Sequence, residues 1–308
     1  MRQNVSFSGH ETFPFRYGWL KKGVEAVASE PGFYSAPDEA MVQLGVGKNM
    51  VNAIKHWCQV TGLLRTVRNP ETNRADHDPT ELADMLVGKS KYDPYFEDPA
   101  TLWLVHWQIA SNSDQCTTWY FLFNLFHKME FTKEQLFVEI QKWLEKENLA
   151  GANENSLKRD IDVCLRTYVH ARGGKRTAVE DTLDCPLTEL NLIGTFEDGK
   201  TYKFARGEQS NLPDEIFLYA IEEFWGRSAD GLNAISLASL TYDPGSPGQI
   251  FKLDENSIVR RLEEVGKLSS GAFRYDETAG LKQLYRQKET SALHWLNIYY
   301  KESAHAKV

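Results

Sequence analysis

Apolar residues recur every three or four positions in two short runs early in the chain. The first run opens at Asp38, a good helix N-cap, and Gly45 suits the left-handed backbone that ends a helix. The second run covers residues 48–60 and stops before Gly62. Its apolar residues share one helical face: Met50, Val51, Ile54, Trp57 and Cys58. The spacing predicts a helix-turn-helix with its turn at residues 45–47.

The opposite face of the second predicted helix is polar and is expected to lie outside. Its residues are Lys48, Asn49, Asn52, Lys55, His56 and Gln59. Lysines contact phosphates, and amide or imidazole groups hydrogen-bond to base edges in a major groove. This face therefore predicts contact with double-stranded DNA. A purely solvated helix face carries the same residue types, and the pattern alone leaves both interpretations open.

A predicted wing follows the second helix. Residues 63–68 alternate between apolar and polar as a strand does, and residues 69–73 form a turn-rich tip. The helix pair with this strand predicts a winged-helix DNA-binding domain over residues 1–91, in which Arg65 and Arg68 add positive charge for DNA.

Residues 76–78, Asp-His-Asp, have side chains that bind metals. Three consecutive residues of a regular element cannot all face one point, so we expect a solvated loop there. A helix is expected to start at residues 79–81. The next domain begins after Lys91, because Pro94 and Pro99 each force the residue before them into an extended conformation.

The second predicted domain, residues 92–212, is helical. Apolar residues are so dense over 102–126 that its helices are expected to be buried on more than one face. Residues 132–135 form a capping-box pattern that opens a helix, residues 151–155 form a turn, and a second helix follows to residue 168. This is a second helix-turn-helix-like unit.

The third predicted domain, residues 213–308, repeats the plan. The loop 242–248 precedes a helix capped by Asp254, and residues 271–275 are suited to start a wing. The buried residues of that helix are predicted to be Ile258, Leu262 and Val265. The expected fold class is therefore mainly α, with several winged-helix or helix-turn-helix-like modules and short β wings.

Charge is distributed unevenly along the 308 residues, whose net charge is −8. Residues 1–75 contain nine Lys or Arg against six Asp or Glu, a balance of +3. The remainder therefore carries −11. A weakly basic segment on an acidic body predicts DNA binding that is modest and sensitive to salt.

Other compositional features narrow the class of protein. No apolar run approaches the ~20 residues of a membrane span, and the N-terminus does not resemble a signal peptide, so a cytoplasmic protein without a membrane partner is expected. The four cysteines are far apart, which predicts buried free thiols. A homodimer would suit nearly symmetric DNA sites.

Residues 7–22 concentrate functional side chains. His10 and Glu11 supply an imidazole and a carboxylate, and the cations are Arg16, Lys21 and Lys22. These groups suffice for phosphodiester hydrolysis assisted by Mg²⁺ or another divalent metal, so His10 and Glu11 are the catalytic candidates. The metal ligands are not assigned. The alternative is structural: both residues hold the segment in place while the cations contact phosphates.

A second acidic pair lies at Asp160 and Asp162. Positions two apart on a helix point about 200° apart, so these carboxylates cannot chelate one ion. An ion-pair network that includes Arg159 is expected instead. The sequence lacks a P-loop and a nucleotide-binding glycine fingerprint, and no nucleotide or organic cofactor is expected.

Four stretches together resemble one bacterial family. They are FSGHETFPFRYGWLKK (7–22), DPYFEDPATLWLVHW (93–107), RDIDVCLRTY (159–168) and EDTLDCPLTELNLI (180–193). The chain resembles the SspB-like family of unknown-function domains associated with DNA phosphorothioation. The resemblance implies a component that nicks DNA so that sulfur enters the backbone, with sulfur-transfer proteins as partners. The alternative is a non-catalytic winged-helix adaptor or transcriptional regulator that recruits the modification enzymes.

Overall fold

The computed structural model describes residues 4–70, 73, 75–149, 153–170, 185–229 and 231–306. Helices dominate, and the strands form small sheets of two or three. The chain forms two compact units: unit 1 is Met1–Leu122 with Lys128–Lys203, and unit 2 is Phe123–His127 with Phe204–Val308. The predicted boundary near residue 91 lies inside unit 1.

The first part of unit 1 contains the predicted helix pair, which follows helix α1. Its elements are α1 (Trp19–Ser29), η1 (Phe33–Ser35), α2 (Pro37–Leu44), α3 (Lys48–Val60), β1 (Leu64–Arg68), β2 (Ala75–Pro79) and α4 (Glu81–Leu86). Helix α3 has the predicted bounds, and Gly45 ends α2 with φ 66°. The predicted N-cap is wrong: Ala36 caps α2, Pro37 takes its first turn, and Asp38 lies inside that turn.

The loop expected at residues 76–78 is part of strand β2, so that prediction is also wrong. β2 pairs antiparallel with β1, with Arg65 opposite Asp78. Asp76 and His77 are buried. Asp76 accepts a hydrogen bond from Asn69 Nδ2 at 2.6 Å, and this partner makes burial of a carboxylate tolerable. The tip residues 71 and 72 lie outside the described residues.

The rest of unit 1 contains a second sheet, β3-β5-β4. Its elements are α5 (Pro99–Ser111), α6 (Thr117–Tyr120), β3 (Glu130–Thr132), α7 (Lys133–Lys146), α8 (Glu154–Tyr168), η4 (Pro186–Leu190), β4 (Ile193–Thr195) and β5 (Thr201–Phe204); η2 (Phe121–Leu125) continues into unit 2. The capping box of Thr132 and Gln135 is confirmed. Residues 151–152 of the predicted turn and 180–184 of the fourth quoted stretch lie outside the described residues.

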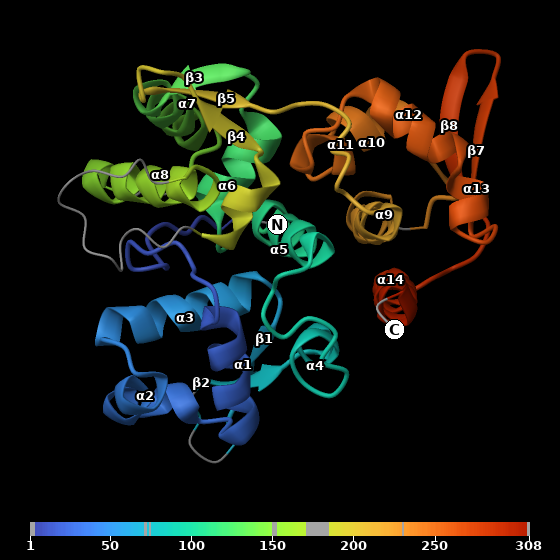
Figure 1. Ribbon diagram of the computed structural model, residues 1–308. Coiled ribbons are helices and arrows are strands. Elements are labelled where there is room, and N and C mark those ends of the chain that lie inside the picture. Colours follow the sequence, from blue (N-terminus) through green and yellow to red (C-terminus); the bar gives the residue numbers. More distant parts are fainter. Residues whose placement is uncertain are drawn as a thin grey trace. The chain divides into compact units, whose positions relative to one another are not determined.

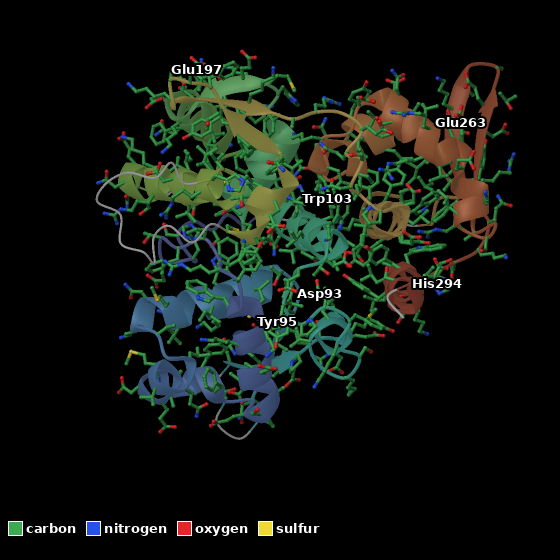
Figure 2. All side chains as sticks on the ribbon, in the orientation of Figure 1. Asp93, Tyr95, Trp103, Glu197, Glu263 and His294 are labelled. Carbon is green, nitrogen blue, oxygen red and sulfur yellow. The ribbon has the colours of Figure 1, made fainter. Side chains whose placement is uncertain are left out.

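Helix α5 is buried on more than one side, as the apolar density predicted. Residues 102–107 are all buried, and six consecutive positions go round the whole helix. Figure 2 labels one of them, Trp103. The preceding connection is held by Asp93, whose carboxylate accepts hydrogen bonds from the backbone N–H groups of Glu97 at 3.1 Å and Asp98 at 3.0 Å. This connection is therefore a fixed turn.

Unit 2 has an order of elements similar to that of residues 117–204. They are α9 (Asp214–Ser228), β6 (Ala234–Ser236), α10 (Leu237–Tyr242), α11 (Pro247–Ile250), α12 (Glu255–Glu263), α13 (Val265–Leu268), β7 (Phe273–Thr278), β8 (Leu281–Arg286) and α14 (Ala292–Ala306). The N-cap Asp254 is confirmed, since its carboxylate accepts from Ser257 N at 2.7 Å. The sheets β3-β5-β4 and β6-β8-β7 both have the last strand in the middle.

Two further findings concern the described residues. None of their helices is long and apolar enough to cross a membrane. Cys58, Cys116, Cys164 and Cys185 are buried free thiols, which confirms that prediction.

A buried lysine contacts the first residue of each of the two segments that form unit 2, Phe123 and Phe204. Lys252 donates a hydrogen bond from Nζ to the carbonyl oxygen of Phe123 at 2.6 Å, and Nζ lies 4.5 Å from the ring centroid of Phe204. Burial lowers the pKa of Lys252 from 10.5 to about 7, because desolvation penalises the charged ammonium, and nearby Arg206 acts in the same direction.

This lysine predicts a pH dependence of stability. Between pH 7 and about 10 an unfolded lysine keeps a proton that folded Lys252 has lost, so the free energy of unfolding should increase with pH by at most about 1.4 kcal/mol per pH unit. Lys252→Met should remove this rise in chemical denaturation curves, whereas Lys267→Met at an exposed site should retain it. Equal slopes in both variants would contradict the prediction.

Candidate nucleic-acid interface

His10 fastens the N-terminal leader, defined as residues 6–18, inside unit 1. Its ring is stacked on Trp57 of α3, with centroids 6.1 Å apart and planes 21° apart, and lies edge-on to Trp119 of α6 at 5.5 Å. Thr12 N donates to His10 Nδ1 at 3.1 Å, so the ring proton is on Nε2, which donates to Asp160 Oδ1 at 2.7 Å. His10 is only 1% exposed.

Helix α8 holds the leader at additional points. Asp160 also accepts from Ser8 N at 2.7 Å, and Arg166 donates to the carbonyl oxygen of Thr12 at 2.6 Å. Ser8 and Thr12 have φ angles of 67° and 71°, and Glu11 also lies in this left-handed region. Such backbone costs about 1 kcal/mol or more per residue and persists where contacts fix it. The leader therefore depends on α8.

The two acidic residues of α8 have separate partners, as their predicted divergence requires. Asp162 pairs with Lys133 at 2.5 Å on the surface, and Asp160 binds the leader. Arg159 is exposed. The expected ion-pair network centred on Arg159 is not seen among the described residues. The residue of this region that ties distant segments together is Asp160, through His10 and Ser8.

The leader covers much of the polar face of α3, and it passes between α3 and α8 (Figure 1). Asn52 Nδ2 donates to Glu11 Oε1 at 3.3 Å. His56 is pressed by Gly9, where an added Cβ would lie 2.6 Å from His56 Nδ1. Burial lowers the pKa of His56 to about 4, with His10 contributing, so His56 is neutral at pH 7.

The expectation that Asn52, Lys55 and His56 all project into solvent is therefore wrong. All three are half-buried. Lys55 Nζ lies 5.9 Å from the ring centroid of Tyr34, and Gln59 donates to Thr66 at 2.9 Å. Helical periodicity identifies the apolar face, but it does not show that a distant polar segment covers the opposite one.

Only the N-terminal end of this polar face is open. Lys48 and Asn49 are exposed and border a groove of about 700 Å³. The groove is lined by Phe13, Arg16, Tyr17, Trp19, Lys22, Gly45, Val46, Gly47, Lys48, Asn49 and Met50. Among these described lining residues there is no carboxylate, whereas three are cations. We call this surface the α3 groove.

The groove has an ordered aromatic wall. The guanidinium of Arg16 lies 5.8 Å from the ring centroid of Phe13 and 5.5 Å from that of Trp19. Trp57 Nε1 donates to the carbonyl oxygen of Phe13 at 2.9 Å. Tyr17 donates its hydroxyl hydrogen to Glu189, and burial with this carboxylate raises the pKa of Tyr17, so the phenol stays protonated.

The first turn of α3 adds positive potential to the groove. Its N-cap is Gly47, no side chain caps it, and no acidic residue lies in the turn. The unpaired N–H groups at a helix start carry partial positive charge and favour anions. With Lys22 and Lys48 beside them, these groups make the groove suited to a phosphate.

The remaining cations predicted to bind DNA lie elsewhere. Lys21 pairs with Glu25 at 3.2 Å and lies 4.9 Å from the ring centroid of Tyr95. On the β1–β2 hairpin, Arg65 pairs with Asp78 at 3.3 Å and Arg68 donates to Asn73 at 2.5 Å. Both arginines are exposed.

Sequence reasoning missed Phe13, Trp19 and the turn 45–47 as parts of one surface. The available signal was the Gly-Val-Gly-Lys turn before α3, because glycines let the backbone approach an anion closely.

The catalytic candidates do not line the groove. His10 is buried, and Glu11 is half-buried beside Asn52. In the part of the chain that the structure describes, no group of three or more His, Cys, Asp or Glu residues is arranged to hold a metal ion. Catalysis by His10 and Glu11 stays a prediction.

The two carboxylates of α8 provide a matched test of the leader contact. Asp160→Ala leaves the buried His10 Nε2 and the half-buried Ser8 N without an acceptor, so the free energy of unfolding should fall by about 3 kcal/mol. Asp162→Ala removes a surface ion pair and should cost less than about 1 kcal/mol. Denaturant titration measures both, and equal losses would show that Asp160 has no special role.

Comparison with known proteins gives the family. The model of a protein family of unknown function, DUF4007, matches residues 7–300. A crystal structure of SspB is similar with a TM-score of 0.85 and 32% identity, covering 97% of this chain and 90% of that chain. A magnesium ion-bound SspB crystal structure has a TM-score of 0.85 and 33% identity, covering 96% and 88%. No curated protein matches significantly. The chain therefore belongs to the DUF4007 family, as an SspB-like member.

Proposed function

We propose that this protein binds double-stranded DNA in the cytoplasm as part of a bacterial phosphorothioation system, together with sulfur-transfer proteins. Its likeness to SspB over nearly the whole chain supports the system. The observation that carries DNA binding is the α3 groove, where Arg16, Lys22 and Lys48 lie together and no carboxylate is found among the described lining residues.

The proposed fold of the DNA-binding parts is the winged helix. Residues 117–204 run helix, strand, helices and a pair of strands. Residues 214–286 follow the same order, with the four helices α10 to α13 before the pair of strands. In both segments the last strand lies in the middle of the sheet. Residues 19–79 have three helices followed by one hairpin. In this proposal the β1–β2 hairpin is a wing that brings Arg65 and Arg68 to the DNA backbone.

The mode of DNA contact differs from that of a helix lying along the major groove. Asn52 and His56 face the leader, so α3 meets DNA through its first turn. The contacts proposed are therefore mainly to phosphates, from Lys22, Lys48 and Asn49. Such contacts position a protein on DNA and carry little sequence information.

The proposed activity is nicking of one DNA strand, which opens the backbone to sulfur. A magnesium-bound SspB supports Mg²⁺ as the metal. The described residues do not fit a protein cage for this ion, because they form no suitable group of three donors. We therefore assign no step to the metal.

The second candidate function is a non-catalytic adaptor or transcriptional regulator that recruits the modification enzymes. The burial of His10 favours it, since both ring nitrogens of this residue are engaged in fixing the leader. In an adaptor, His10 and Glu11 serve the shape of the DNA-binding surface alone.

The phosphate contacts can be tested by the salt dependence of duplex binding. Replacing Lys22 and Lys48 together by Ala should lower the slope of log K against log salt by about 2, because each phosphate contact contributes about 0.9. Lys55→Ala is the control, as Lys55 lies against Tyr34. Gel shifts at several salt concentrations measure the slope. An unchanged slope in the double variant would show that DNA phosphates do not bind in the α3 groove.

Nicking separates the two candidate functions. Supercoiled plasmid incubated with Mg²⁺ or Mn²⁺ should yield open circles, and a chelator should prevent this. If His10 and Glu11 are catalytic, His10→Ala and Glu11→Gln should abolish nicking and spare gel shifts. Intact binding by the unaltered protein without open circles under any metal would favour the adaptor.

A further inference from the structure

The α3 groove contains more than phosphate contacts require. Phosphate recognition needs cations and N–H donors, yet Phe13, Tyr17 and Trp19 also line the groove. Tyr17 is 47% exposed and Phe13 is half-exposed, so both rings present surface to a ligand. A volume of about 700 Å³ lies in the usual range for sites that enclose a small molecule or part of a larger one.

The aromatic wall is fixed before any ligand arrives. Trp19 is nearly buried and lies edge-on to Phe13, with ring centroids 6.2 Å apart. Tyr17 is tied to Glu189, and the backbone of Phe13 is tied to Trp57. Rings held in this way lose little conformational entropy when a flat group packs on them.

Aromatic rings beside phosphate-binding cations are the combination that recognises unstacked nucleotides. In a duplex the faces of the bases are covered by their neighbours, so the rings have nothing to stack on. In a single strand each base has a free face, and stacking on an aromatic side chain adds affinity with little sequence preference. Arg16 extends the wall with a planar cation that also stacks.

We propose that the α3 groove binds one unpaired nucleotide of a DNA strand, with its base against Phe13 and Tyr17 and its phosphate at Lys22, Lys48 and the first turn of α3. This rests on the proposed function and makes it more specific. The protein holds a strand locally opened from the duplex. A phosphopeptide is the competing ligand. Its phosphate would contact the cations, and nothing would stack on the aromatic rings.

The base contact can be tested with the full-length protein and three oligonucleotides of one length. One is single-stranded with 2-aminopurine, the second is the same strand with abasic sites, and the third is the blunt duplex. The single strand should bind about tenfold more tightly than the abasic strand, and 2-aminopurine fluorescence should be quenched by stacking. Equal affinity for the abasic strand would overturn the base contact.

Two ring variants locate the base. Phe13→Leu and Tyr17→Leu should each weaken single-strand binding about tenfold and change duplex binding less than twofold. Melting temperatures identify a variant that fails to fold, and the other then decides. If every folded ring variant binds the single strand like the unaltered protein, the base does not occupy the groove.

Gly47 offers a matched pair for the phosphate contact. Its φ of −73° suits any residue, and an added Cβ meets no atom within 4 Å. Gly47→Asp and Gly47→Asn both cap α3, but only Asp brings negative charge. Gly47→Asp should weaken single-strand binding at least tenfold, and Gly47→Asn less than threefold. Equal affinities of the two variants would remove the phosphate from this turn.

The outcomes also distinguish this inference from the proposed function. If the protein binds duplex tightly and shows no preference for unstacked bases, the α3 groove does not hold an unpaired nucleotide, but the proposed DNA binding stands. If the unaltered protein binds neither duplex nor single strand, both proposals are wrong. If a phosphoserine peptide displaces the labelled single strand at a lower concentration than the unlabelled single strand does, the groove binds a protein partner and the proposed nucleotide site is wrong.

Discussion

The hydrogen bond between His10 and Asp160 is the constraint on which the α3 groove of unit 1 depends. Both groups are almost completely buried, and a buried carboxylate must find donors or destabilise the fold. Asp160 Oδ1 accepts from both His10 Nε2 and Ser8 N, which fixes the path of the leader. The leader then covers the middle of α3, and Phe13, Arg16 and Tyr17 take their places beside its first turn.

This constraint explains how an acidic protein can have a surface suited to nucleic acid. The net charge of −8 repels DNA from most of the chain. The α3 groove concentrates three cations and the start of a helix in a small area with no lining carboxylate among the described residues. A short interface of this kind gives weak binding on its own, which agrees with the proposal that the protein acts together with sulfur-transfer proteins.

Local patterns predicted the helices well, because caps and periodicity act within a few residues. The bounds of α3, the capping box at Thr132 and the N-cap at Asp254 are confirmed. The strand at residues 75–79 was missed because its polar residues hide the alternation, and its pairing with β1 decides the conformation.

The candidate site was only partly predictable. The cations and the helix start were visible in the sequence, but their grouping depends on Asp160, which is 150 residues from His10. No local pattern links residues so far apart. The wrong exposure of Asn52 and His56 has the same origin, since the segment that covers them is not a neighbour on their helix.

The central claim is that α3 meets DNA at its first turn and that the leader shields the rest of the helix. Amide hydrogen exchange with and without bound DNA tests this most directly, since it reports protection along the backbone. The account predicts added protection at residues 13–22 and 45–50, with residues 52–59 unchanged. DNA-dependent changes centred on residues 52–59, with loss of protection in residues 6–12, would show that the leader leaves and that the whole helix contacts DNA.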